Sequence, residues 1–169
     1  MSSWYVVHTR SNYENRCVNE LKRKGLETYL PVFRELHQWK DRRKIVETPL
    51  FRSYAFVHFS DSALARLAVL RSEGVVKILG TENTPTPIPN EEIEVIQFIL
   101  KKTAGRCQSH PLLREGAWVR VKRGALKDIE GRLIRVKNQT RLVVSVNLLS
   151  QSVSAEVDAN DVQLLRAES

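Results

Sequence analysis

Four basic side chains lie close together in the first third of the chain: Lys40, Arg42, Arg43 and Lys44. They fall in a polar stretch between two segments that alternate like β-strands, so we expect them at the tip of a hairpin. Basic side chains bind phosphate groups without reading bases, and such binding weakens steeply with salt. Trp39 beside them is able to stack on an unpaired base. The cluster is a candidate nucleic-acid contact, and a merely solvated hairpin tip stays open as the alternative.

Catalytic chemistry has no comparable candidate in this sequence. No serine or cysteine lies in a nucleophile motif, and no glycine-rich phosphate loop opens a predicted helix. Glu91, Glu92 and Glu94 stand together at the start of a predicted helix, where acidic side chains complement the helix dipole. We therefore predict that the protein is not an enzyme and that it needs no cofactor.

Metal and disulfide frameworks are disfavoured by the spacing of the possible ligands. Cys17 and Cys107 lie far apart without C-x-x-C spacing, and the histidines are scattered singly. We expect both thiols to be reduced and no metal to be bound.

The charge of the chain favours an anionic partner or neighbourhood. The net charge is +8 and the pI is about 9.8. The excess of Lys and Arg over Asp and Glu is four in residues 1–105 (16 against 12) and four in residues 106–169 (11 against 7). The sequence has no apolar run of membrane-spanning length and no charged-then-apolar leader, so we expect a cytoplasmic monomer without membrane contact.

The first hundred or so residues predict an antiparallel sheet packed with three helices. Strand-forming residues occupy 4–9, 28–36, 45–48, 54–59 and 75–79. Ser11 and Glu14 form a capping box that predicts the start of the first helix. Asp61 is expected to cap the second helix and Asn90 the third. Three side chains of the second helix are expected to face inward: Leu64, Leu67 and Ala68.

Two glycines bracket a loop in the C-terminal part, where VRVKRG ends at Gly124 and GRLIRV begins at Gly131. Val119 and Val121 share one strand face, and the basic residues beside them share the other. Further strands follow at the spacing of a five-stranded SH3-like barrel. The predicted class is α+β, with a first domain over 1–105, a linker over 106–111 and the barrel over 112–169.

The order of these segments resembles the NusG family over nearly the whole chain. The matching pieces are WYVVHT at 4–9, YE at 13–14, PLF at 49–51 running into YAFV at 54–57, GV at 74–75 and the glycine-bracketed loop, which is a KOW pattern. The resemblance implies that residues 1–105 are a NusG N-terminal (NGN) domain that docks on the clamp helices of RNA polymerase. It also implies a KOW domain that recruits Rho or a small-subunit ribosomal protein, with DNA or nascent RNA nearby in the elongation complex.

The resemblance assigns a docking pocket to an aromatic strand. By alternation, Tyr54, Phe56 and His58 share one strand face. An apolar face left open marks a partner site, although aromatic residues in strands are also commonly buried in the core. The resemblance places Phe51, Tyr54 and Phe56 in the pocket for the clamp helices, and His8 where a specialised paralogue carries an aromatic residue.

Two departures from the family pattern bear on the branch of the family. General NusG proteins carry Pro-Gly where this chain has Arg52-Ser53, and Pro-Phe where it has Ala125-Leu126. These departures favour a specialised antitermination paralogue of the RfaH, UpxY or LoaP kind. Four aliphatic residues are candidates for the KOW partner contact, with core packing as their alternative: Leu126, Ile129, Leu148 and Leu149.

We therefore predict a transcription elongation regulator that promotes processive elongation or antitermination. Two alternatives stay open. One is a general NusG that assists Rho-dependent termination, and the other is a ribosome-associated or RNA-binding KOW protein that binds RNA tightly without polymerase.

Overall fold

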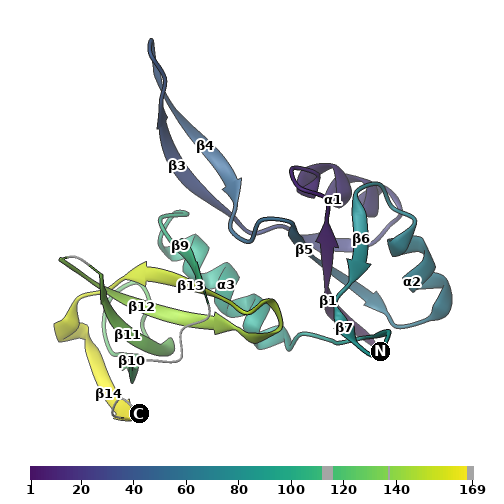
Figure 1. Cartoon of the computed structure of the whole chain (residues 1–169). Helices are drawn as coiled ribbons and strands as arrows, with labels where there is room; N and C mark the ends of the chain where they lie inside the picture. Colours follow the sequence, from purple (N-terminus) through teal and green to yellow (C-terminus); the bar gives the residue numbers. More distant parts are fainter. Residues whose placement is uncertain (112–115, 137, 167–169) are drawn as a thin grey trace. The chain divides into compact units, whose positions relative to one another are not determined.

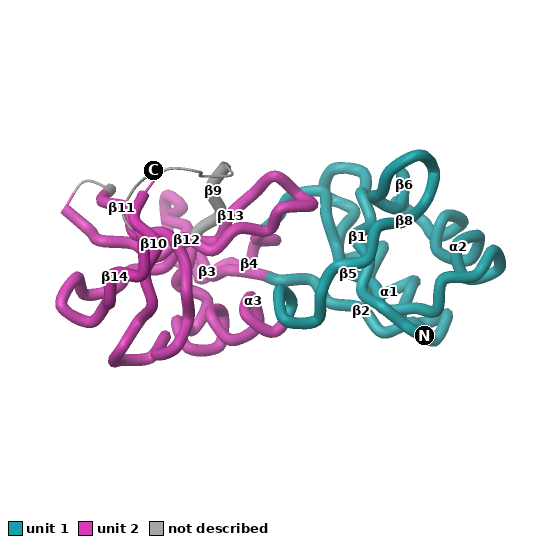
Figure 2. Tube along the Cα trace, turned by 90° about the horizontal axis from the view of Figure 1, so that it is seen from below, with its two compact units in different colours: residues 1–31, 51–93 teal, residues 32–50, 94–169 magenta. Residues whose placement is uncertain are grey.

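The computed structural model describes residues 1–111, 116–136 and 138–166, without the side chains of 108–111 and 136. Its contacts divide the chain into two compact units (Figure 2). Unit 1 consists of residues 1–31 and 51–93, and unit 2 of residues 32–50 and 94–169. In the described part of the chain, no helix has the length and apolar character needed to cross a membrane.

Unit 1 is built on an antiparallel sheet with the strand order β2-β5-β1-β6 (Figure 1). The strands are β1 (Ser2–Thr9), β2 (Glu27–Tyr29), β5 (Tyr54–Ser60) and β6 (Val75–Ile78). Helices α1 (Glu14–Arg23) and α2 (Ala63–Leu70) belong to the same unit, with the small hairpin of β7 (Gly80–Thr81) and β8 (Thr84–Pro85). Together with unit 2, this arrangement confirms the predicted α+β class.

One face of this sheet forms a core with the helices, as its strand alternation predicts. The aliphatic and aromatic side chains of this core are at most 5% exposed: Tyr5, Val7, Cys17, Val18, Leu21, Ala55, Val57, Phe59 and Val69. The set combines alternate positions of β1 and β5 with the inward sides of α1 and α2. Burial raises the pKa of the Cys17 thiol to about 11, so it stays protonated and unreactive at neutral pH.

Helix α2 presents a different side to the sheet from the one expected. Leu64 and Leu67 are 81% and 43% exposed, and Val69 is fully buried with Ala65 packed beside it. The expected inward position of the two leucines is therefore wrong. Ala65 and Val69 stand four residues apart, which places both on one helix face, and the small Ala65 lets the helix lie close to the sheet.

The caps of the first two helices also differ from the expected ones. Ser62, not Asp61, caps α2, because the Ser62 hydroxyl accepts a hydrogen bond from the Ala65 N–H at 3.2 Å. Asp61 instead forms an ion pair with Arg66. At α1 the capping box with Ser11 is absent, since no side-chain hydrogen bond caps this helix.

The side chain of Glu14 does not cap its own helix and reaches a distant turn. Its Oε1 accepts a hydrogen bond from the Ser53 N–H at 2.8 Å, and the glutamate is only 6% exposed. The Ser53 carbonyl accepts from the Thr9 N–H at 2.8 Å, and the Tyr54 N–H donates to the Phe51 carbonyl at 3.2 Å. The turn before β5 is thus fixed to both β1 and α1.

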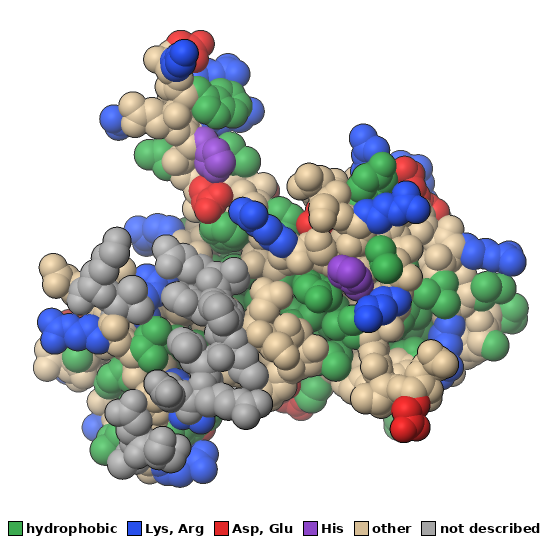
Figure 3. Space-filling view, viewed as in Figure 1, with side chains coloured by type: hydrophobic (Ala, Val, Ile, Leu, Met, Phe, Trp, Pro, Cys, Tyr) green, Lys and Arg blue, Asp and Glu red, His purple; other side chains and the backbone are tan. Residues whose placement is uncertain are grey.

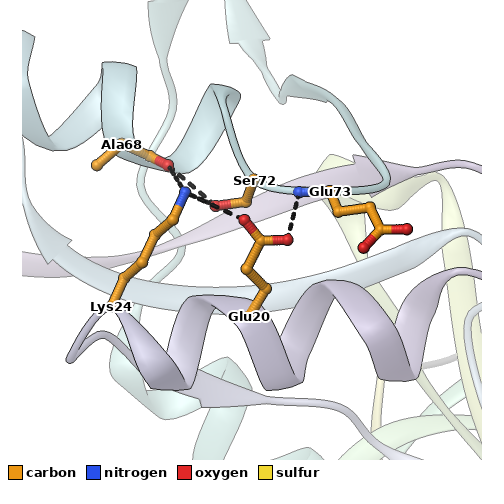
Figure 4. A network of polar contacts seen from close by, with 5 residues as sticks. All are labelled: Glu20, Lys24, Ala68, Ser72 and Glu73. Atoms are coloured by element: carbon orange, nitrogen blue, oxygen red, sulfur yellow. Dashed lines mark hydrogen bonds and ion pairs between the residues drawn. The ribbon is translucent and has the colours of Figure 1, made fainter.

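A second polar contact joins α1 to the end of α2 (Figure 4). The Lys24 ammonium donates to the Ala68 carbonyl at 3.0 Å and to the Ser72 hydroxyl at 2.8 Å, and it lies 3.3 Å from Glu20. Glu20 in turn accepts from the Glu73 N–H at 2.7 Å. A lysine at the last carbonyls of a helix satisfies groups that the helix itself leaves unpaired.

Unit 2 contains the hairpin of β3 (Val32–Gln38) and β4 (Arg43–Pro49), most of α3 (Asn90–Lys102) and a barrel-like sheet. Among the described residues, the strands of this sheet follow the order β14-β10-β11-β12-β13-β9. They are β9 (Gln108–Pro111), β10 (Ala117–Val121), β11 (Glu130–Val136), β12 (Gln139–Val146), β13 (Gln151–Glu156) and β14 (Val162–Arg166), with short 3-10 turns at Asn147–Leu149 and Ala159–Asp161. The segment expected as a linker thus includes β9, while the division into functional domains stays a prediction.

The two bracketing glycines of the barrel serve different purposes. Gly124 has a φ of +92°, a backbone conformation that residues with a Cβ adopt at a cost. At Gly131 a Cβ would stand 2.5 Å from the Val143 carbonyl oxygen of the neighbouring strand, so only glycine permits this close approach. The sheet face predicted from the valines is confirmed, since Val119 and Val121 are each 2% exposed.

Ser53 offers a test of the turn. Its φ of +65° is left-handed, at the position where general NusG proteins were expected to carry glycine. The left-handed conformation costs a non-glycine residue about 1 to 2 kcal/mol, and glycine adds about 0.5 to 1 kcal/mol of chain entropy to the unfolded state. We therefore expect Ser53→Gly to stabilise the protein by roughly 0.5 to 1 kcal/mol, measured by urea unfolding.

Ser60→Gly, at the exposed end of β5, is the control, and it also removes the hydrogen bond between the Ser60 and Ser2 hydroxyls at 3.0 Å. Ser60 lies in extended backbone, so the same substitution there should destabilise the protein by about 0.5 to 1 kcal/mol. A Ser53→Gly variant that is less stable than the wild type would contradict this account of the turn.

Candidate functional site

Three cross-strand pairs line the face of the unit 1 sheet that points away from α1 and α2. They are Trp4 with His58, Val6 with Phe56, and His8 with Tyr54. The two outer pairs each place a histidine ring against an aromatic ring, with centroids 5.1 Å apart in the first and 5.3 Å apart in the last. The central pair is fully buried.

Phe51 and Phe56 do not lie on an open surface. Phe56 is fully buried and Phe51 is 1% exposed, with their rings edge to face at 6.3 Å. On the other side, the Tyr29 ring stacks with Phe56 at 6.0 Å. The expectation that Phe56 lies on an open strand face is therefore wrong, because Phe51 and the Tyr29 ring of β2 lie beside it. Phe51, which the resemblance places in the docking pocket, is buried as well.

The open part of this face is its rim. His8 and Tyr54 are half-buried, and both stand next to the turn that Glu14 fixes. At the other end, His58 is half-buried and its Nδ1 lies 3.2 Å from the Glu27 carboxylate. Of the four residues predicted for polymerase binding, the structure thus leaves two with accessible surface, and these two contact each other.

The basic cluster lies where it was expected, at the tip of the β3–β4 hairpin. Its four members are all exposed: Lys40, Arg42, Arg43 and Lys44. The Trp39 N–H donates to the Arg42 carbonyl at 2.9 Å, and the Arg42 guanidinium lies 5.1 Å from the centre of the Trp39 ring. The indole is 46% exposed, so one aromatic ring stands among the cations at the tip.

Sequence reasoning missed an apolar pair on the same hairpin. Leu36 and Ile45 are opposite each other in the register and are 64% and 63% exposed. The neighbouring pair on the same face, Arg34 with Glu47, is charged. Strand alternation places Arg34, Leu36 and Gln38 on one face, and the polar neighbours of Leu36 there were the signal that this face is exposed. Basic and apolar side chains mix along the hairpin in Figure 3.

Of the four residues predicted to contact a KOW partner, two are buried and two are half-buried. Leu126 and Leu149 are 4% and 7% exposed, so the core alternative holds for these two residues. Ile129 and Leu148 are half-buried and keep part of their surface open. Leu126 is drawn inward by the tight loop after Gly124, in which its carbonyl accepts from the Ile129 N–H at 3.1 Å.

Nothing in the described residues forms a cluster of side chains able to hold a metal ion. The two cysteines are free and buried, and burial raises the pKa of the Cys107 thiol, like that of Cys17, to about 11. A thiol with such a pKa supplies almost no thiolate at neutral pH, so neither cysteine is suited to act as a nucleophile.

Comparisons with known proteins agree with the fold and the motifs. A family model described as "Transcription termination factor nusG" matches residues 2–97 of this chain. The "Transcription termination/antitermination protein NusG" of Rickettsia conorii is 26% identical over 96% of this chain and 90% of its own length. The protein of the same name from Vibrio vulnificus is 27% identical over 96% of this chain and 95% of its own.

A solved structure supports the fold. The structure titled "Domain interaction in Thermotoga maritima NusG" superposes with a TM-score of 0.60 at 17% identity, covering 98% of both chains. Because the family model spans more than half of the sequence and the relatives align over nearly all of it, this chain belongs to the NusG family of transcription factors, which are not enzymes.

Proposed function

We propose that this protein binds the clamp helices of RNA polymerase through the rim of the β1–β5 face and promotes processive elongation and antitermination. The observation that carries the proposal is the contact between His8 and Tyr54, whose rings lie 5.3 Å apart and are half-buried on a sheet whose centre is closed. Aromatic side chains with a rigid backing are typical anchors for a partner helix.

The position of the rim supports this role. Ser53 immediately precedes Tyr54, and its backbone is held on one side by Glu14 and on the other by Thr9. A side chain that is already fixed loses little conformational freedom when a partner binds. In this proposal the buried rings of Phe51 and Phe56 support the rim by packing beneath it. Direct contact of these two rings with polymerase stays a prediction.

The hairpin tip supplies a second contact in this proposal. Its four exposed cations and the partly exposed Trp39 suit the phosphates and unpaired bases of DNA or nascent RNA in an elongation complex. Such contacts hold the nucleic acid in place without selecting a sequence.

The KOW domain is proposed to recruit a second factor, either Rho or a small-subunit ribosomal protein. Ile129 and Leu148 are the two members of the predicted contact that keep open surface. The relatives carry names that include both termination and antitermination. We favour antitermination because Arg52-Ser53 and Ala125-Leu126 depart from the pattern of the general factor.

Truncation of Tyr54 tests the docking rim. We expect Tyr54→Ala to weaken binding to purified polymerase by about 1 to 2 kcal/mol, or roughly 5- to 30-fold in Kd, because a desolvated aromatic anchor is lost. Tyr54→Phe keeps the ring and should retain most of the affinity. Arg23→Ala, an exposed position at the end of α1, serves as the unrelated control. Equal binding by wild type and a folded Tyr54→Ala variant would remove the rim from the site.

Phe56→Ala is unsuitable for this purpose. The ring is fully buried, so its removal should cost about 3 to 5 kcal/mol of stability whether or not polymerase touches it. Any loss of binding by that variant would report on folding.

Neutralising the hairpin tip tests the nucleic-acid contact. We expect replacement of the four cations by glutamine to flatten the salt dependence with which the protein binds a polymerase elongation complex, since fewer counterions are released. The measurement is the slope of log K against log salt. The control neutralises two exposed cations of unit 1, Lys22 in α1 and Arg71 directly after α2, and it should leave the slope as it is. An unchanged slope in the hairpin variant would favour the solvated tip.

Single-round transcription tests the function as a whole. Purified polymerase of the same organism is followed across a termination site with and without the protein, and the readout is the fraction of full-length RNA. We expect more read-through. More termination in the presence of Rho would identify a general NusG instead, and no effect together with no polymerase binding would favour the RNA-binding alternative.

A further inference from the structure

The outer face of the barrel carries a row of three large side chains across strands β14, β10 and β11. Trp118 in β10 is opposite Arg166 in β14 and opposite Arg132 in β11. Each guanidinium carbon lies 5.8 Å from the centre of the indole ring. Trp118 is half-buried, so this indole keeps accessible surface between two cations.

A second row lies beside the first. Arg120 is opposite Glu130 in β11 and opposite Gln163 in β14. The Arg120 Nε donates to the Glu130 carboxylate at 2.8 Å, and this hydrogen bond holds the pKa of Glu130 below its usual value. The carboxylate therefore stays ionised beside Arg120, and it also accepts a hydrogen bond from Trp118 and interacts electrostatically with Arg166.

Arg132 and Arg166, the two arginines of the first row, differ from Arg120 in their partners. Within the described residues, the ion pairs do not include Arg132 or Arg166. Arg132 donates to the Gly116 carbonyl at 3.0 Å, which fixes its position and leaves its charge uncompensated by that bond. The row therefore presents two guanidiniums on either side of one aromatic ring, and Glu130 offsets part of the charge of Arg166.

The barrel does not need this row for its core. Val119 and Val121 on the opposite side of β10 are buried, and they supply the packing. A tryptophan on the outward side offers a large apolar surface to solvent unless a ligand covers it. The flanking guanidiniums lie close to the ring, an arrangement that also suits a stacked base, because guanidinium planes stack on aromatic faces.

We infer that this surface, the Trp118 face (Trp118, Arg132 and Arg166), binds single-stranded nucleic acid. A base stacks on the indole or on a flanking guanidinium plane, and the two arginines bind phosphates. An acidic peptide covers the indole with a flat ring only where it also carries an aromatic side chain, whereas every nucleotide of a single strand carries both a phosphate and a flat base. A duplex keeps its bases stacked on one another. The site lies on the KOW barrel, apart in sequence from the hairpin tip at residues 39–44.

Binding of short oligonucleotides by the whole chain, without polymerase, tests the inference. The probes are fluorescently labelled twelve-residue uridine RNA, thymidine DNA of the same length and a duplex of the same length, followed by anisotropy. We expect both single strands to bind more tightly than the duplex. Trp118→Leu should weaken single-strand binding about 5- to 150-fold, the equivalent of about 1 to 3 kcal/mol for one stacked base, and Trp118→Phe should keep most of the affinity.

The double substitution Arg132→Gln and Arg166→Gln tests the charges. For two phosphates on a single strand, the slope of log K against log salt should fall by about 1.4. Neutralising Lys22 and Arg71 in unit 1 is the control with the same loss of charge. Thermal unfolding of every variant shows whether the barrel is folded, and the arginine pair carries the test if Trp118→Leu is not.

The inference is overturned if folded Trp118→Leu and the double arginine variant both bind within twofold of the wild type. It is also overturned if the duplex binds as tightly as the single strands, or if the hairpin glutamine variant alone abolishes all binding. A preference between the RNA and the DNA probe identifies the natural source of the ligand. Because polymerase is absent, failure here leaves the proposed polymerase contact unaffected, and failure of that contact leaves the Trp118 face unaffected.

Discussion

The first unit depends on one buried carboxylate. Glu14 accepts the N–H of Ser53, whose backbone is left-handed and whose carbonyl is bound by the end of β1. A buried N–H left without a partner costs about 1 to 3 kcal/mol, so this bond ties the start of α1, the end of β1 and the start of β5 to one point. Tyr54 follows directly, and the same interaction therefore supports both the fold and the proposed docking rim.

Closure of the sheet decides where a partner is able to bind. Val6 and Phe56 form a buried pair at the centre of the second face, and histidine–aromatic pairs stand at its two ends. A partner that reaches this face meets His8 and Tyr54 at one end, with packed side chains behind them. Packed side chains beneath a binding surface fix its shape before the partner binds, and this favours a partner of complementary shape.

The positive charge of the chain is arranged around aromatic rings at two places in the second unit. Trp39 stands among the cations of the hairpin tip, with a guanidinium 5.1 Å from its centre. Trp118 stands between Arg132 and Arg166 on the barrel. Charge alone explains attraction to any polyanion, whereas the pairing of charge with an accessible aromatic ring favours strands whose bases are unpaired.

Local pattern determined most of the strands, the division of their faces, the two barrel glycines and the hairpin with its basic tip, because alternation and turn chemistry act between near neighbours. The single strand expected over 28–36 was wrong, since the chain breaks at Leu30 and Pro31 into β2 of unit 1 and β3 of unit 2. Local pattern did not determine what covers each face. Glu14 has the spacing of a capping box but binds Ser53, 39 positions away. Phe56 has the position of an exposed aromatic but lies between Phe51 and Tyr29. Only the tertiary structure decided these outcomes, because burial and long-range hydrogen bonds depend on segments that meet only in the folded chain.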